Sequence, residues 1–70
     1  MYHLLKIKGK SQIPDYIQLR DSNFTLVAYF RQDRPERALI KCGLERFQNI
    51  ILTKAEKLEY GKIEKIKLHD

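Results

Sequence analysis

The chain has 70 residues, of which 14 are Lys or Arg and 9 are Asp or Glu, so it carries a formal net charge of +5. Hydrophobic residues make up 43% of the chain and charged residues 33%, which is typical of a globular rather than a disordered protein. This length sets a ceiling of one domain, residues 1–70. No apolar run approaches the roughly 18 residues that a membrane-spanning helix needs, and the first residues do not resemble a secretory signal. We therefore expect a basic cytoplasmic protein without a membrane span.

The distribution of reactive residues argues against catalysis and against a metal site. Cys42 is the one cysteine, and His3 and His69 lie near opposite ends of the chain. A zinc site needs about four ligands at defined spacing. No serine or cysteine belongs to a motif that would place a base beside it, and the isolated glycines form no phosphate-binding loop. We expect a non-enzymatic protein with no catalytic residues, no cofactor and no metal.

Three strands are predicted in the first half of the chain, because apolar residues there recur with a period of two. Residues 2–8 alternate imperfectly, and their more polar face gains lysines toward its end. Residues 16–20 place Ile17 and Leu19 on one face. Residues 24–31 give the strongest strand signal, and we expect Phe24 on the same face as Ala28 and Phe30. The turn residues 21–23 between the last two runs predict a hairpin.

A helix is predicted next. The residues Asp33-Arg-Pro-Glu36 have the outline of a capping box, with Asp33 as the N-cap and a proline in the first turn. The helix would cover residues 34–42 and end at Gly43, where a left-handed residue is common.

The segment from residue 47 to residue 60 permits two interpretations. Residues 48–52 are rich in β-formers, and a second helix start signal follows at Thr53. Alternatively, one helical face would hold Leu44, Phe47, Ile51, Ala55 and Leu58. We predict a strand and then a helix, ended by Gly61, with a last strand over residues 62–68. The predicted fold is a small single α+β domain with the order β-β-β-α-β-α-β, an antiparallel or mixed sheet of about four or five strands, and two short helices.

Basic residues form two clusters that suit phosphate binding, one on the first strand and one on the first helix. The predicted phosphate-binding residues are Lys6, Lys8, Arg34, Arg37 and Lys41. Arginine can donate two hydrogen bonds to one phosphate, and Tyr16 and Tyr29 could stack on unpaired bases. Lysines that alternate along a strand also serve solubility and block aggregation at a sheet edge.

The hairpin also predicts a protein-binding surface, because two short helices cannot cover both faces of a sheet. Aromatic residues and arginine are the types that most often dominate protein interfaces. The predicted partner-binding residues are Tyr16, Arg20, Val27, Tyr29 and Arg31. The competing interpretation is that these side chains are covered within the monomer or in a homo-oligomer. We expect an accessory or adaptor protein that binds a protein partner or a larger complex; the alternative is an RNA- or DNA-binding protein.

Overall fold

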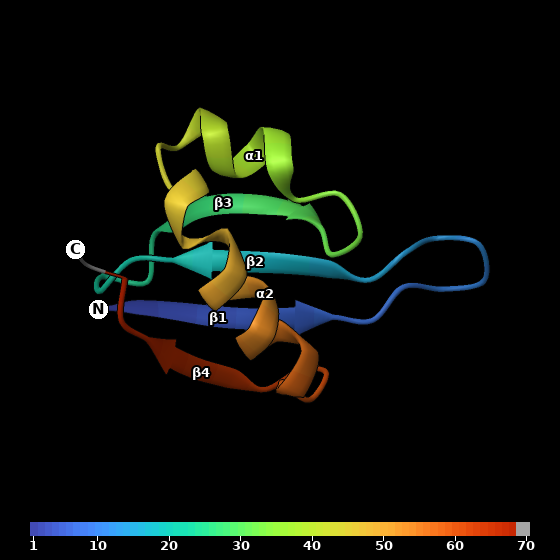
Figure 1. The fold of residues 1–70 in the computed structure, drawn as a ribbon. Helices are drawn as coiled ribbons and strands as arrows, with labels where there is room; N and C mark the ends of the chain where they lie inside the picture. Colours follow the sequence, from blue (N-terminus) through green and yellow to red (C-terminus); the bar gives the residue numbers. More distant parts are fainter. Residues whose placement is uncertain (69–70) are drawn as a thin grey trace.

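The computed structural model describes residues 1–68, which form one antiparallel sheet with its helices on one side (Figure 1). The elements in chain order are β1 (Tyr2–Ile7), β2 (Tyr16–Arg20), β3 (Leu26–Arg31), α1 (Glu36–Lys41), the 3₁₀ turn η1 (Glu45–Phe47), α2 (Gln48–Lys57) and β4 (Ile63–Ile66). Residues 1–68 thus form a small single α+β domain with four strands and two α-helices. No helix within residues 1–68 is both long enough and apolar enough to cross a membrane.

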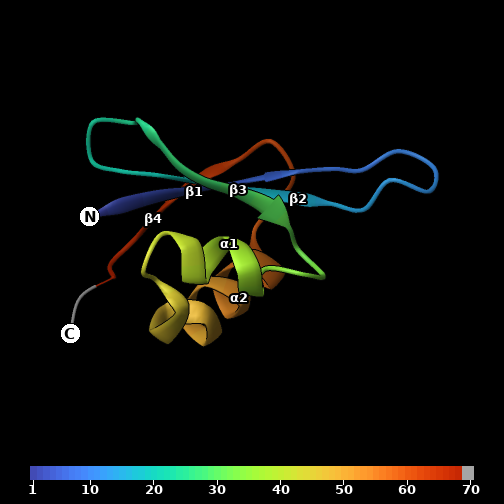
Figure 2. The ribbon, with the colours of Figure 1, turned by 90° about the horizontal axis from the view of Figure 1, so that it is seen from above.

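The four strands have the spatial order β3-β2-β1-β4, and every neighbouring pair is antiparallel. Hairpins join the first three strands. The helical segment then carries the chain from β3, at one edge, to β4, at the other (Figure 1). Figure 2 shows α1 and α2 on the same side of the sheet, with no helix on the opposite side. The two faces of the sheet therefore have different environments.

The core lies between the sheet and the helices. Leu4, Ile17 and Leu19 from the sheet, together with Leu39 from α1 and Ile51 from α2, have no exposed surface. The period-two pattern of β1 and β2 explains the contribution of the strands, since alternate side chains point to the same face. The expected pattern in residues 16–20 and the hairpin of β2 with β3 are confirmed.

The strand predicted over residues 48–52 is wrong, because these residues form the first half of α2. The alternative helical face is the one observed: Leu44, Phe47, Ile51, Ala55 and Leu58 are all buried in the core. Burial of this face against the sheet outweighs the local preference of the segment for strand. Thr53 consequently lies inside α2 and does not begin a helix. The element order is β-β-β-α-α-β.

The predicted start of the first helix is also wrong. The N-cap of α1 is Pro35, no side chain caps the helix, and α1 covers Glu36–Lys41 rather than residues 34–42. The carboxylate of Asp33 instead pairs with Arg31, at 2.9 Å. Gly43 has a φ of +72°, which confirms the expected left-handed residue after the helix. The last strand is shorter than predicted, and His69 lies outside the described residues.

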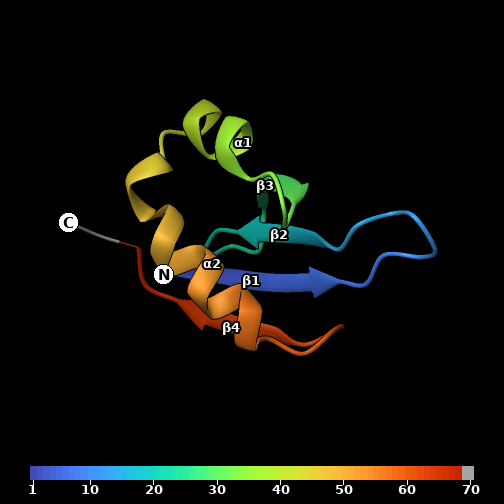
Figure 3. The same cartoon turned by 45° about the vertical axis from the view of Figure 1, so that its right-hand side comes forward.

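The loop between β1 and β2 extends away from the body of the protein (Figures 1 and 3). Asp15 lies where this loop joins β2 and makes two hydrogen bonds there. Its Oδ1 accepts from the Gly9 N–H at 2.8 Å, and its Oδ2 accepts from the Tyr60 hydroxyl at 2.7 Å. These two hydrogen bonds hold the pKa of Asp15 below its ordinary value, with smaller contributions from the positive charges of Lys6 and Lys8. The same bond to Asp15 raises the pKa of Tyr60. The loop is thereby attached to the turn that precedes β4.

Candidate functional site

The face of the sheet away from the helices carries three rows of side chains, which we call the open face. Residues that are directly opposite in an antiparallel sheet share a face. The first row, from β3 to β4, holds Tyr29, Gln18, Leu5 and Ile63. The second row holds Arg31, Tyr16 and Ile7. The third row holds Arg20, His3 and Lys65. These rows contain aromatic, apolar and basic residues and no carboxylate.

Tyr16 and Tyr29 form an aromatic pair on the open face. Their ring centroids are 5.0 Å apart, and their planes are inclined by 35°. Tyr29 lies on the edge strand β3 and is 52% exposed, whereas Tyr16 is half-buried. The monomer therefore leaves the predicted aromatic anchor accessible.

A second aromatic group lies at the other end of the hairpin. Phe24 has a φ of +65°, so it belongs to the turn before β3. Its ring contacts the ring of His3, with centroids 5.5 Å apart, and the guanidinium of Arg20, at 4.8 Å. The prediction that Phe24 lies on the face of Ala28 and Phe30 is wrong, because Phe24 lies outside β3 and because the register of β2 with β3 shifts between Leu19 and Arg20.

The turn that positions Phe24 is built by Asp21. Its Oδ1 accepts from the N–H groups of Asn23 and Thr25, both at 2.9 Å, and its backbone carbonyl accepts from His3 Nδ1 at 3.1 Å. The sequence predicts the turn at residues 21–23 but does not indicate that His3 and Phe24 belong to this site. Asp-Ser-Asn indicates a turn, but it does not specify which later residue takes a positive φ.

Both predicted arginines are held by neighbouring groups. Arg20 donates through Nε and Nη2 to Gln18 Oε1, at 3.2 and 3.0 Å, and through Nη1 to the Phe24 carbonyl at 3.0 Å. Arg31 donates to both carboxylate oxygens of Asp33, at 3.0 and 2.9 Å. Hydrogen bonding within this pair raises the pKa of Arg31 and lowers the pKa of Asp33. The charge of Arg31 is thus largely matched, while Arg20 is fixed by neutral acceptors and keeps an unmatched charge.

Val27 is placed differently from the other predicted partner-binding residues. It is half-buried, packs against the core cluster and lines a shallow cavity between β3 and α1 with Ala38 and Cys42. The register of β2 with β3 shifts between Leu19 and Arg20, next to this position. The open face therefore holds four of the predicted residues, Tyr16, Arg20, Tyr29 and Arg31. Val27, which belongs to the edge strand β3, instead packs against the core.

The predicted phosphate-binding residues do not form one track. Lys6 is only 8% exposed, on the same side of the sheet as Leu4, and its ammonium lies 4.9 Å from the ring centroid of Tyr60. Lys8 lies 5.7 Å from the same ring. Three others, Arg34, Arg37 and Lys41, are exposed in or beside α1. Since β2 separates β1 from β3, the strand cluster and the helix cluster are not brought together.

Comparison with known proteins gives no relative from which a function could be inferred. No protein-family model, no curated protein and no solved structure matches the chain. Within the part of the chain that the structure describes, no three His, Cys, Asp or Glu side chains gather where they could hold a metal ion. Cys42 is half-buried, and its thiol donates to the Ala38 carbonyl at 2.8 Å.

Proposed function

We propose that this protein is a non-enzymatic adaptor or accessory subunit that binds a protein partner through the open face. The observation that carries the proposal is the exposed Tyr16–Tyr29 pair on a helix-free sheet face whose cross-strand rows hold no carboxylate. Aromatic side chains supply much contact area while losing little conformational entropy, because only two side-chain torsions must be fixed. An apolar patch with basic residues around it is typical of a partner-binding surface.

The chemistry of the open face favours a partner with an apolar patch and carboxylates at its rim. Tyr29, Leu5 and Ile63 supply apolar contact along the first row. Arg20 and Lys65 supply positive charge at its border, and Arg20 is already held in position by Gln18. A fixed cation loses less side-chain entropy on binding, which supports a role for Arg20 in orienting the partner.

Nucleic-acid binding is the second candidate, and it rests on the exposed Tyr29 of β3 and on the exposed basic residues in or beside α1. A cavity lined by Tyr29 and Lys41 connects the two elements. The burial of Lys6 and the pairing of Arg31 with Asp33 leave few cations for successive phosphates. Binding of a phosphate backbone should weaken tenfold or more, as an order of magnitude, between about 50 and 200 mM salt.

The test of the proposed function is affinity capture from a lysate of the source organism with the wild-type protein and with Tyr29→Ala. Each captured protein is purified and titrated against both forms by calorimetry. We expect a partner that binds one to one and loses about tenfold or more in affinity with Tyr29→Ala. The matched control is Ile40→Ala, since Ile40 is 61% exposed on α1 and should not affect this affinity.

The opposite results contradict the proposal. A purified partner that binds Tyr29→Ala as tightly as wild type, but loses affinity with Ile40→Ala, would place the interface on the helices. Steeply salt-dependent binding of labelled single-stranded RNA or duplex DNA, weakened by the Arg34→Ala/Arg37→Ala double variant, would favour the nucleic-acid function instead.

A further inference from the structure

The outer edge of β4 is a second surface with binding potential, separate from the aromatic pair. β4 pairs with β1 on one side and is the last strand of the sheet on the other. In such an edge strand, alternate residues direct their N–H and C=O groups away from the sheet. An extended segment of another chain can add to an edge of this kind by forming the missing ladder of hydrogen bonds.

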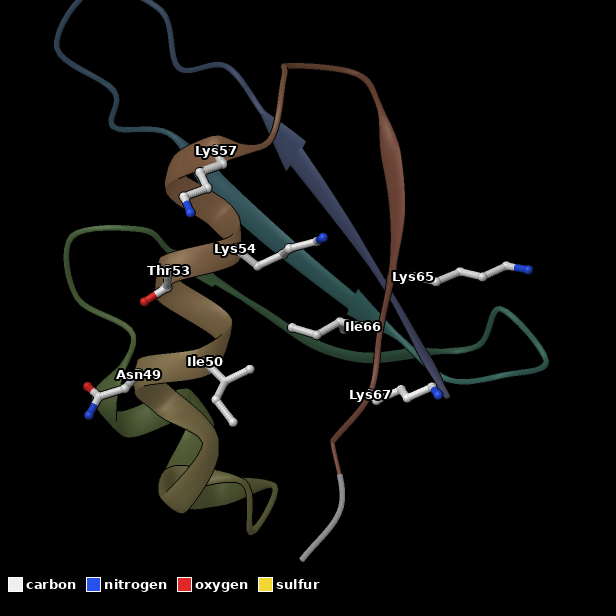
Figure 4. Close-up of a pocket in the computed structure, with 8 residues that line it drawn as sticks. All are labelled: Asn49, Ile50, Thr53, Lys54, Lys57, Lys65, Ile66 and Lys67. Atoms are coloured by element: carbon white, nitrogen blue, oxygen red, sulfur yellow. The ribbon is translucent and has the colours of Figure 1, made fainter.

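A groove runs between β4 and α2 next to this edge. Its volume is about 570 Å³, and it is lined by Asn49, Ile50, Thr53, Lys54, Lys57, Lys65, Ile66 and Lys67. Figure 4 shows Ile50 and Ile66 pointing into the groove from its two walls. Ile50 is 51% exposed, although it lies in the same helix as the fully buried Ile51. An aliphatic side chain entering the groove would cover Ile50.

Lysines border the groove and β4 on both sides of the sheet. Among the described residues that line the groove, none is acidic and four are lysines. Figure 4 shows Lys54 directed from α2 toward β4. Its ammonium pairs with the carboxylate of Glu64 on β4, at 2.8 Å. Among the described residues, Lys57, Lys65 and Lys67 have no ion-pair partner. Figure 4 shows Lys65 and Lys67 pointing away from α2, so positive charge flanks β4 on the side opposite the groove as well.

We propose that the β4 edge and the α2–β4 groove bind an extended acidic segment of a protein by strand addition. Successive side chains of an added strand point to opposite sides of the sheet. Those on the helix side would place aliphatic groups against Ile50 and Ile66. Carboxylates at the positions between them would point to the opposite side of the sheet and would face Lys65 and Lys67. The groove thus selects for aliphatic residues at alternate positions, and the lysines select for acidic residues between them.

The same lysines disfavour a second copy of this chain as the occupant. Pairing β4 with β4 of another molecule would bring Lys65 and Lys67 close to their own equivalents. Like charges on adjacent strands are destabilising, and edge lysines commonly prevent self-association for this reason. With an acidic strand, the interaction of Lys65 and Lys67 with the added chain becomes attractive. The lysines therefore disfavour pairing of β4 with another β4 and favour pairing with an acidic segment.

The experiment uses a fluorescein-labelled, end-blocked peptide of about nine residues, in which Val or Ile alternates with Asp or Glu. Anisotropy measures its affinity, and amide chemical shifts of the labelled protein locate its site. We expect saturable binding with shifts in β4 and in residues 49–57. A peptide with Lys in place of every acidic residue should not bind. In an added strand, only every second backbone N–H of the peptide can donate to β4. N-methylation of the peptide amides at these alternate residues should abolish binding, whereas N-methylation at the residues between them should not.

Protein variants separate this site from the open face. Ile50→Glu and Lys67→Glu should each weaken the peptide by about tenfold. The matched controls are Ile40→Glu on α1 and Lys10→Glu in the β1–β2 loop, which make the same changes at distant exposed positions and should leave the affinity unchanged. Tyr29→Ala should also leave it unchanged, so failure of the proposed adaptor function would not affect this result. Thermal unfolding confirms that each variant is folded.

Three results would overturn the inference. The first is the absence of binding up to about 1 mM peptide, a concentration at which even a weak site with a binding free energy near −4 kcal/mol is half occupied. The second is equal binding of the lysine peptide or of both methylated peptides. The third is a set of chemical-shift changes confined to the residues around Tyr16 and Tyr29.

Discussion

Tyr16 and Tyr29 lie on neighbouring strands with their ring centroids 5.0 Å apart, on the side of the sheet that carries no helix (Figure 2). The register pairs Tyr16 with Arg31 and Gln18 with Tyr29, so the two tyrosines are diagonal neighbours. Each ring restricts the other, and Tyr29 still exposes about half of its surface, at 52%. This combination of restriction and exposure suits a preorganised contact surface.

The contact between the two rings should be measurable in the free energy of unfolding. We expect Tyr16→Ala, Tyr29→Ala and the double variant to give a favourable coupling energy of about 0.5–1 kcal/mol in a double-mutant cycle. Urea unfolding followed by circular dichroism measures it. Strictly additive effects would show that the rings do not interact in solution.

Replacement of Gly9 should destabilise the protein because of its close surroundings. A Cβ at this position would lie 1.9 Å from the Ile13 carbonyl oxygen and 2.5 Å from that of Pro14, and both atoms belong to the backbone. Gly9→Ala should therefore cost at least about 1 kcal/mol and lower Tm by several degrees. The control is Gly61→Ala, which meets no neighbouring atom and suffers only from its φ of +74°. If Gly61→Ala costs more than Gly9→Ala, the described loop conformation is wrong.

The Asp15–Tyr60 hydrogen bond should make stability depend on pH at both extremes. The pKa of Asp15 is lowered from its ordinary value of 3.8, so its contribution is present above that pH and is lost as pH falls through the folded pKa. The pKa of Tyr60 is raised from 10.0, so its contribution is present below that pH and is lost as pH rises through the folded pKa.

The variant that tests this bond is Tyr60→Phe, and Tyr2→Phe in β1 is the control for loss of a tyrosine hydroxyl at another position. Urea unfolding between pH 2 and pH 11 gives the difference in unfolding free energy between wild type and each variant. For Tyr60→Phe this difference should be largest between about pH 5 and pH 9 and should decrease toward both extremes. A difference that is independent of pH would exclude the hydrogen bond to Asp15.

Adjacent isoleucines in α2 should respond very differently to truncation. Ile51 has no exposed surface, whereas Ile50 is 51% exposed. Ile51→Ala should cost about 2–5 kcal/mol by leaving a cavity in the core, and Ile50→Ala should change stability by no more than about 0.5 kcal/mol. Chemical denaturation measures both. Equal costs would contradict the docking of α2 on the sheet through Ile51, Ala55 and Leu58.

The parts of the fold that the sequence predicts correctly depend on local alternation. Ile17 and Leu19 are buried and Tyr16 and Arg20 share the other face, because a strand fixes which residues share a side. Residues 48–52 could not be assigned in this way, since a short run of β-formers also fits a helix whose other residues pack on the sheet. Only burial of Phe47 and Ile51 together decides between the two structures.

In the candidate site, too, local alternation along the strands predicts some positions correctly, and the others depend on long-range packing. Four of the five predicted partner-binding residues share the open face, because strand alternation and one hairpin suffice to place them. The sequence predicts that Lys6 belongs to an exposed basic cluster, but Lys6 is buried on the helix side of the sheet, with its ammonium against the ring of Tyr60. The choice between the two faces of β1 depends on where the helices dock, and the helix positions are set by contacts between residues far apart in the chain. The alternation of Ala28 and Phe30 does not extend back to Phe24, because the register of β2 with β3 shifts between Leu19 and Arg20 and because Phe24 belongs to the turn, with a φ of +65°.

Binding of a partner through the open face can be tested by site-specific photo-crosslinking. Tyr29 is replaced by p-benzoylphenylalanine, and a second protein carries the same group at Ile40 on α1, another exposed apolar position. We expect position 29 to crosslink a discrete protein and position 40 to give no such product. The product from position 29 should disappear with Arg20→Glu in the same chain. A discrete product from position 40 and none from position 29 would contradict the claim that the open face binds the partner.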